Sequence, residues 1–203
     1  AQNIKKGFKE YINNYYLNND INQNYEKLKV EASNLDAKIK QTVTNSENKI
    51  IVASSDLFKF LEKYNIEVIS LEEDIRSIKV KDGDTLSAIS QEYNVSTSDI
   101  LTYNNKTDEV LTPGEVIEIP IKVISSSDVS LVKKLINENK IKYIYTSSDE
   151  TNDTVNELIT NYDLELIKIN DMYSVDGGVT NSNENYLTIM NNNLDLIKKE
   201  LMK

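Results

Sequence analysis

The residues best suited to chemistry lie together in the stretch Asp82-Gly83-Asp84-Thr85-Leu86. Gly83 permits a backbone turn that a side chain would block. Asp84 or Thr85 can cap a helix that begins near Leu86, because a short oxygen-bearing side chain accepts hydrogen bonds from the first amides of a helix. The stretch therefore offers a carboxylate and backbone amides to a polar ligand, while the same residues would also cap a helix that binds nothing.

Composition removes several classes of function. The 203 residues contain no histidine and no cysteine, and they carry neither a Gly-x-Ser-x-Gly elbow nor a phosphate-binding loop. The acidic run Glu72-Glu73-Asp74 is interpreted as a solvated linker rather than as paired catalytic carboxylates. A net charge of −10 argues against nucleic acid as a partner, because phosphate binding needs clustered Lys and Arg. We therefore expect a binding protein and not an enzyme.

Short apolar runs alternate with amphipathic patterns along most of the chain. The runs predict four strands, at 50–53, 66–71, 142–146 and 164–169. The amphipathic patterns predict helices at 1–18, 19–44, 56–65, 127–140, 149–162 and 186–202. Strands that alternate with helices indicate right-handed βαβ units. The predicted fold class is α/β, a parallel four-stranded sheet with flanking helices, and the long helix 19–44 either packs along the domain flank or spans two lobes.

The alternation is interrupted at 78–123. Both prolines of the chain, Pro113 and Pro120, and two of its five glycines lie in this stretch. Its pattern predicts a strand at 78–80, helices at 86–94 and 98–105, and a strand at 116–120. The ends of such a βααβ unit are adjacent when its two strands pair antiparallel, so the unit can be inserted in a loop of another domain. The insertion follows the strand at 66–71, at the edge of a parallel sheet where ligands bind.

The inserted segment, 77–123, resembles a LysM domain. The matching residues, in order and at family spacing, are Val80, Gly83, Asp84, Thr85, Leu86, Ile89, Tyr93, Val95, Ser96, Ile100, Asn104, Leu111, Gly114, Ile117, Ile119 and Pro120. The resemblance implies binding to glycans that contain N-acetylglucosamine (GlcNAc), such as peptidoglycan or chitin. It places the groove between Gly83, Asp84, Thr85 and Leu86 on one side and Val110, Leu111 and Thr112 on the other. There the polar groups would meet a sugar hydroxyl or acetamido group, and Leu86 with Val110-Leu111 would pack on the acetyl methyl. The alternative is that Leu86, like Ile89 and Ile100, lies in the core of the module.

Residues 1–76 and 124–203 resemble the C-terminal lobe of the cluster A-I metal-binding lipoproteins, the manganese and zinc substrate-binding proteins of ABC transporters, some of them adhesins. The segments that carry the resemblance are "AQNI" (1–4), "YEK" (25–27), "NLDAKIK" (34–40), "IVASSDLFKFLEKYNIEVI" (51–69), "LVKKLINENKIKYIYTSS" (131–148) and "YLTIMNNNLDLIKKEL" (186–201). The first lobe of the family is absent, so we interpret the chain as a piece of a longer protein. The resemblance implies an extracytoplasmic position on the bacterial cell surface, a lipid anchor in the missing N-terminal part, and an ABC permease as a partner of the full-length protein.

The same resemblance implies a metal site to which this lobe contributes two ligands. The first position, a His or Glu in the family pattern, falls on Ser55, and the second falls on Asp171 in "KINDMYS". A further acidic position of the family is Thr146 here. Asp171 matches, but a serine hydroxyl is a poor ligand for Mn²⁺ or Zn²⁺ beside His or carboxylate. We therefore expect a degraded half-site and no cofactor in this chain, with Mn or Zn belonging to the full-length protein.

Two functions follow from these expectations. The first is a transporter-linked metal-binding lipoprotein that its LysM module holds near the cell wall. The second is a cell-wall-binding or adhesive surface protein that reuses the fold without metal. In either case the segments Glu72–Arg76 and Ile124–Ser127 are predicted to be short linkers that keep the module close to its host. A bound glycan would then lie against the rim of the interlobe cleft.

Overall fold

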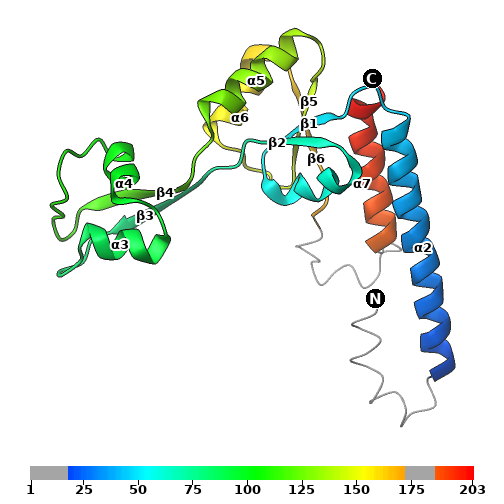
Figure 1. Cartoon of the computed structure of the whole chain (residues 1–203), viewed down its shortest axis with the longest axis horizontal. Coiled ribbons are helices and arrows are strands. Elements are labelled where there is room, and N and C mark those ends of the chain that lie inside the picture. Colours follow the sequence, from blue (N-terminus) through cyan, green and yellow to red (C-terminus); the bar gives the residue numbers. More distant parts are fainter. Residues whose placement is uncertain (1–17, 172–185) are drawn as a thin grey trace.

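A computed structural model describes residues 18–171 and 186–203 of the chain (Figure 1). Its elements, in chain order, are α2 (Asn18–Thr44), β1 (Ile50–Ala53), the 3₁₀ helix η1 (Asp56–Tyr64), β2 (Glu67–Ser70), β3 (Asp74–Lys79), α3 (Leu86–Tyr93), α4 (Thr97–Tyr103), β4 (Val116–Lys122), α5 (Ser126–Asn137), β5 (Tyr143–Thr146), α6 (Asp153–Tyr162), β6 (Glu165–Lys168) and α7 (Tyr186–Leu201). The predicted strands are present, and η1 takes the place of the helix expected at 56–65. The helix expected at 1–18 lies almost wholly outside the described residues.

The four strands of the sheet domain form one parallel sheet in the order β2-β1-β5-β6, which confirms the predicted α/β architecture. Successive residues of a strand point to opposite faces of a sheet. On β1, Ile51 and Ala53 accordingly lie in the core cluster formed with α2, η1 and α7, whereas Val52 lies in a second cluster formed with α5 and α6. Helices therefore cover both faces, which explains why the strands are continuous apolar runs.

Short polar side chains set the limits of several helices. The side chains of Thr85, Ser125 and Asn152 accept hydrogen bonds from the third following amide at the starts of α3, α5 and α6. Asn94 and Asp163 adopt the left-handed conformation directly after α3 and α6, with φ values of 54° and 53°. Asn and Asp tolerate this conformation better than most residues, so they end helices without glycine.

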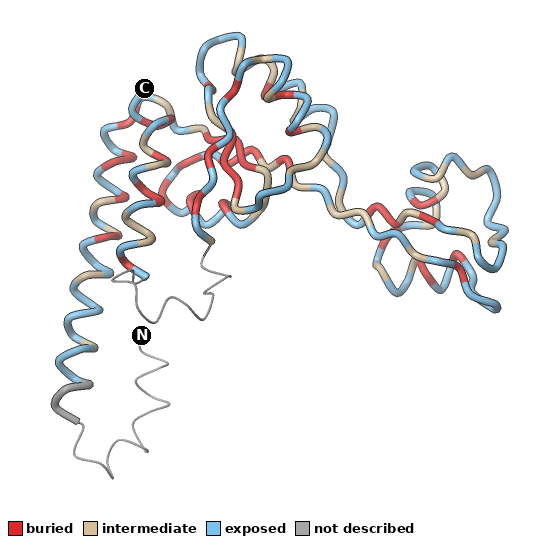
Figure 2. Tube along the Cα trace, turned by 180° about the vertical axis from the view of Figure 1, so that it is seen from behind, coloured by how far each residue is buried: buried red, intermediate tan, exposed pale blue. Residues whose placement is uncertain are grey.

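Among the side chains of α2 that the structure describes, from Asn22 onward, the buried apolar ones lie in the second half of the helix. Leu35, Ile39 and Val43 are buried, whereas Leu28 and Val30 in the first half are 38% and 57% exposed. Figure 2 shows the same change as a long exposed stretch that continues beyond the packed part of the helix. The helix therefore lies along the domain flank over one half and projects beyond the domain over the other.

The inserted module stands away from the sheet domain on a two-stranded ribbon (Figure 1). β3 and β4 pair antiparallel from Asp74 and Lys122, next to the sheet domain, to Lys79 and Val116 at the far end. The module has its own core, which consists of Val80, Leu86, Ile89, Val95, Ile100, Ile117 and Ile119. This core shares no residue with the two clusters of the sheet domain, so the module is a separately packed unit.

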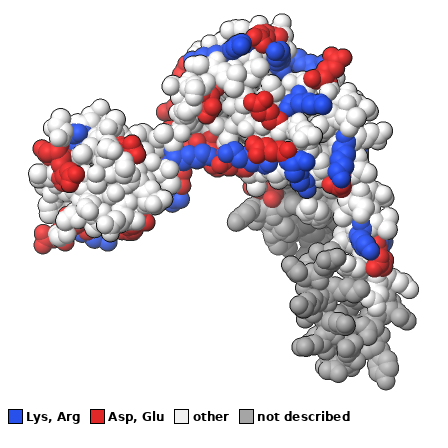
Figure 3. All heavy atoms as spheres, in the orientation of Figure 1, with Lys and Arg blue, Asp and Glu red and all other residues white. Residues whose placement is uncertain are grey.

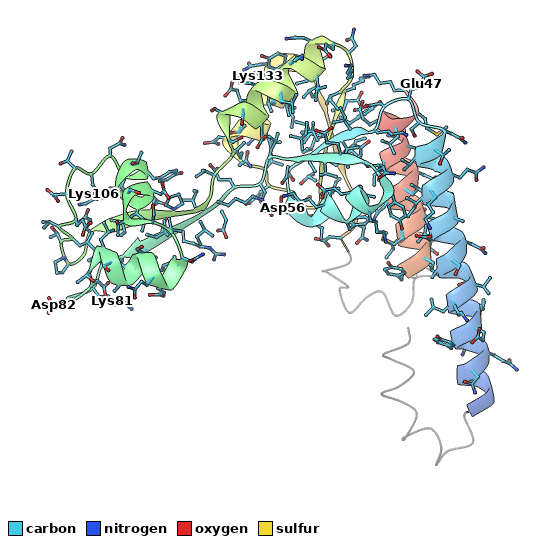
Figure 4. All side chains as sticks on the ribbon, in the orientation of Figure 1. Glu47, Asp56, Lys81, Asp82, Lys106 and Lys133 are labelled. Carbon is cyan, nitrogen blue, oxygen red and sulfur yellow. The ribbon has the colours of Figure 1, made fainter. Side chains whose placement is uncertain are left out.

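The structure corrects the expected connection between the two parts. Asp74–Arg76, expected within a linker, form the first half of β3. The loops expected to form the groove follow Lys79 and precede Val116, at the end of the ribbon remote from the sheet domain. Figure 4 shows Lys81 and Asp82 at that outer tip. A glycan held by these loops would therefore lie far from the sheet, and the expectation that it lies against an interlobe cleft is wrong.

Lys122 forms two ion pairs at the base of the ribbon. Lys122 Nζ, at the end of β4, lies 2.6 Å from Asp56 Oδ2 and 2.6 Å from Glu72 Oε2. Burial alone would raise the pKa of Asp56, but hydrogen bonds from Lys122 and Lys59 hold that pKa well below its usual range. The three linked side chains, Lys122, Asp56 and Glu72, are called the joint below. They line a cavity of about 250 Å³ between the ribbon and the sheet domain.

We predict that Lys122→Met loosens the ribbon, because the Asp56 and Glu72 carboxylates then repel each other with no cation between them. The free energy of unfolding should fall by about 1 kcal/mol, as for a partly exposed ion pair. The contribution of Asp56 to the free energy of unfolding is present above the ordinary pKa of 3.8, and it is lost as the pH falls through the lower pKa of the folded state. The difference between wild type and variant should therefore shrink in acid.

The motion of the module relative to the sheet domain can be measured as the distance between two spin labels, by double electron–electron resonance. Because the chain has no cysteine, labels at Gln91→Cys on α3 and Asn137→Cys on α5 are unambiguous. Lys122→Met should broaden the distance distribution. Lys59→Met is the matched control, because Lys59 also pairs with Asp56, at 3.0 Å, but lies within the sheet domain. A distribution unchanged in Lys122→Met, or broadened equally in both variants, would contradict the assigned role of the joint.

Candidate functional site

The first wall of the candidate groove is the loop between β3 and α3. Gly83 has a φ of +88°, and no atom lies within 4 Å of the place that a Cβ would take, so glycine is needed for the backbone conformation and not for space. The Asp84 carboxylate accepts a hydrogen bond of 2.7 Å from the amide of Lys81, and the Thr85 hydroxyl accepts one of 3.2 Å from the amide of Ala88. Thr85 is therefore the helix cap, while Asp84 closes the turn and stays exposed.

The second wall is the loop between α4 and β4. Val110 is 68% exposed. Thr112 is also exposed, and Leu111 is half-buried against the module core. The amide of Thr112 donates to Glu115 Oε2 at 2.9 Å, and its carbonyl oxygen accepts from the amide of Glu115 at 2.9 Å. The loop is thus anchored by Leu111 and presents the apolar Val110 side chain and the Thr112 hydroxyl to solvent.

The two walls are joined through Val80. The amide of Val80 donates to the carbonyl oxygen of Glu115, and the carbonyl oxygen of Val80 accepts from the amide of Gly114, each at 2.8 Å. Gly114 has a φ of +91°, which again favours glycine. Val80 directly precedes the first loop, and Gly114 and Glu115 end the second. The fold therefore brings both groups of expected groove residues to one end of the module, although their contact with a glycan stays a prediction.

Leu86 lies in the core of the module, one of the two places expected for it. It is 2% exposed and belongs to the module core with Ile89 and Ile100. Its side chain could not pack on an acetyl methyl without leaving that core, so the apolar contact falls to Val110.

No sequence motif marked Lys106 and Glu115, which form an ion pair of 2.6 Å beside the second loop. Their opposite charges on either side of the loop are the only sequence signal for this pair.

The expected metal half-site lies at the carboxyl edge of the parallel sheet. Ser55 follows β1, Asp171 lies beyond β6, and Thr146 ends β5 between them. The Ser54 hydroxyl donates to Thr146 Oγ1 at 2.9 Å, across the point between β1 and β5 where the strand order reverses and α/β sheets commonly bind ligands. Thr146 is fully buried. Asp171 instead lines a polar depression of about 590 Å³ together with Ser148 and other residues of the β5 and β6 loops.

These donors do not fit a metal ion. The Ser55 hydroxyl donates to Glu72 Oε1 at 3.1 Å and accepts from the amide of Leu57 at 3.1 Å, so it serves as a helix cap and as a neighbour of the joint. A neutral hydroxyl is in any case a weak ligand for Mn²⁺ or Zn²⁺. Within residues 18–171 and 186–203, no group of three or more acidic side chains is placed to hold a metal ion. No metal-binding step is therefore assigned to this lobe.

Residues 78–120 match the family model of the LysM domain, so the inserted module is a LysM domain. The match covers both loops of the candidate groove. A comparison with curated proteins gives no match for the chain. Among the helices of the described part of the chain, none has the length and hydrophobicity needed to cross a bilayer.

The fold of the chain is similar to that of solved metal-binding lipoproteins. The Zn(II)-bound ZnuA-like domain of AdcA from Streptococcus pneumoniae shares 15% identity at a TM-score of 0.54, over 96% of this chain. The metal-dependent lipoprotein YcdH from Bacillus subtilis shares 14% identity at a TM-score of 0.56, over 96% of this chain. The laminin-binding protein Lmb from Streptococcus agalactiae shares 11% identity at a TM-score of 0.55, over 95% of this chain. It is described as bifunctional, with adhesin and metal-transporting activity.

The chain spans 57% of the length of each of these three proteins. Identities this low show the fold and not the activity. The chain thus combines a LysM domain with part of the fold that these three solved proteins share.

Proposed function

We propose that the chain is the C-terminal part of a bacterial cell-surface lipoprotein whose LysM module binds a GlcNAc-containing glycan of the cell wall. Its sheet domain keeps the fold of a metal substrate-binding protein with a degraded half-site. The observation that carries the proposal is the pair of loops joined through Val80 at the outer end of the module. These loops are exposed, and they are held in place by hydrogen bonds independent of any ligand.

The chemistry of the two loops suits a GlcNAc unit. The sugar carries an acetyl methyl, an amide and several hydroxyl groups. Val110 offers an exposed apolar side chain for the methyl, and Asp84 and Thr112 offer hydrogen-bonding groups. Acidic side chains gather at the outer end of the module in Figure 3, which disfavours a polyanionic ligand. A few polar and apolar contacts on exposed loops of this kind give millimolar to micromolar affinity, or about 4–8 kcal/mol.

The position of the module adds a role for the ribbon. The groove lies at one end of β3 and β4, and the joint lies at the other. A glycan held at the tip therefore leaves the carboxyl edge of the sheet accessible. In the full-length protein this edge would face the missing lobe, and the transporter-linked function would require ligands for Mn or Zn from that lobe and an ABC permease as partner.

The alternative is a cell-wall-binding or adhesive protein that works without metal. It is favoured by one observation, the use of Ser55 and Glu72 in hydrogen bonds and ion pairs that serve helix capping and the joint. The structural relative Lmb combines adhesin and metal-transporting activity in one protein. The two candidates share the glycan-binding module and differ only in whether the full-length protein captures metal.

We predict that the chain is retained on insoluble peptidoglycan and that Val110→Asp reduces this retention at least about fivefold, since a buried charge would face the acetyl methyl. Val123→Asp is the matched control, because Val123 is 53% exposed but lies at the base of the ribbon. The measurement is the bound fraction after sedimentation, with both variants checked for unchanged thermal unfolding. Equal retention of the two variants, or no retention of the wild type, would contradict the proposed glycan function.

We predict that this chain has no stoichiometric site for Mn²⁺ or Zn²⁺ that depends on Asp171. Calorimetric titration of wild type and Asp171→Asn should give the same weak, non-saturating heats, as expected for an acidic surface. The reason is that Asp171 lacks a second ligand at Ser55. A saturable zinc isotherm that disappears in Asp171→Asn would overturn the assignment of a degraded half-site and favour the transporter-linked candidate.

A further inference from the structure

The second wall of the groove is a long connection without regular structure. It runs from the end of α4 at Tyr103 to the start of β4 at Val116. At its beginning, the Asn104 side chain donates to the carbonyl oxygen of Glu118 at 2.7 Å and accepts from the amide of Glu118 at 2.8 Å. This fixes α4 to β4 but leaves Val110 several residues away. A loop of this kind holds a ligand-binding residue in place only if further contacts order it.

Glu115 provides those further contacts. Its Oε1 lies 2.6 Å from Lys106 Nζ, at the start of the loop, and its Oε2 accepts from the amide of Thr112 at 2.9 Å. Its carbonyl oxygen accepts from the amide of Val80, which leads into the first wall. A single residue therefore contacts the beginning of the second wall, its ligand-facing part and the first wall.

The Lys106–Glu115 pair is partly shielded from water. The two side chains are 21% and 26% exposed, so their attraction is screened less than that of a fully exposed pair. The hydrogen bond from Lys106, followed by that from the amide of Thr112, lowers the pKa of Glu115. The carboxylate is therefore ionised at neutral pH and accepts both hydrogen bonds at once.

We propose that Lys106 and Glu115 are positioning residues of the glycan site, which order the loop that carries Val110 and Thr112. The inference rests on the proposed function, because the ligand is the same GlcNAc polymer. The pair touches the loop and not the sugar. Its loss should weaken glycan binding by letting the loop move, while the core that folds the module is left intact.

The test compares five single variants of the full chain, among them Lys106→Arg, which keeps the charge of Lys106. Lys106→Met removes the cation and keeps the aliphatic stem, and Glu115→Gln removes the charge and keeps an oxygen for the amide of Thr112. Lys79→Met and Glu92→Gln are matched controls on exposed positions of the module. Affinity for the GlcNAc hexamer is measured by calorimetry, and thermal unfolding is recorded for each variant.

We expect Lys106→Met and Glu115→Gln each to weaken hexamer binding about fivefold, the effect of losing one partly shielded ion pair. The controls should bind as the wild type does. Lys106→Arg should bind the hexamer as the wild type does, because it keeps the positive charge. If the loss in Lys106→Met came only from changed packing, the charge would make no such difference. Hydrogen exchange of the Thr112 amide, measured without ligand, should be faster in Lys106→Met than in Lys79→Met.

The outcomes separate this inference from the proposed function. If the wild type does not bind the hexamer, the proposed function fails, and this inference fails with it. If the wild type binds and both charge-removing variants bind equally well, only the positioning role is overturned. If both variants unfold the module, the pair stabilises the fold in general, and a specific positioning role is overturned as well.

Discussion

One ammonium group at the base of the ribbon links the inserted module to two carboxylates of the sheet domain. Lys122 lies between Asp56 and Glu72, which follow the ends of β1 and β2. Two carboxylates this close are stable together only because a cation shares them. The same lysine ends the strand that carries the LysM domain. The lysine therefore ties the ribbon to the sheet domain, together with Leu71 and Ile124, which pack in the cluster formed with α5 and α6.

The joint also explains the chemistry of the sheet edge. The carboxyl edge of a parallel sheet is where α/β proteins usually bind ligands. Here the Ser55 hydroxyl donates a hydrogen bond to Glu72. The Ser54 hydroxyl donates one to Thr146, which links the ends of β1 and β5. Binding capacity is thus expected at the outer end of the inserted module, where two loops meet through Val80, and not at the edge of the sheet.

The parts of the fold that depend on local pattern could be predicted from the sequence. Apolar runs such as Ile50–Ala53 marked the buried parallel strands, and Thr85 was among the expected helix caps. The ribbon could not be predicted in full, because Asp74-Ile75-Arg76 has the composition of a linker and becomes a strand only through its pairing with β4. Leu86 was expected in the groove or in the core, because an apolar residue after a cap suits either place, and it lies in the core. The contacts of Lys122 with Asp56 and Glu72, both far away in the sequence, leave no sequence signature.

The central claim is that glycan binds at the outer loops and leaves the sheet edge untouched. The most direct test is a titration of the isotope-labelled chain with the GlcNAc hexamer, followed by the amide signals in NMR spectra. We expect saturable shifts of the amides of Gly83, Asp84, Val110 and Thr112, with those of Ser55 and Thr146 unchanged. Shifts confined to the sheet edge, or the absence of saturable shifts at both places, would show that the outer loops do not bind the glycan.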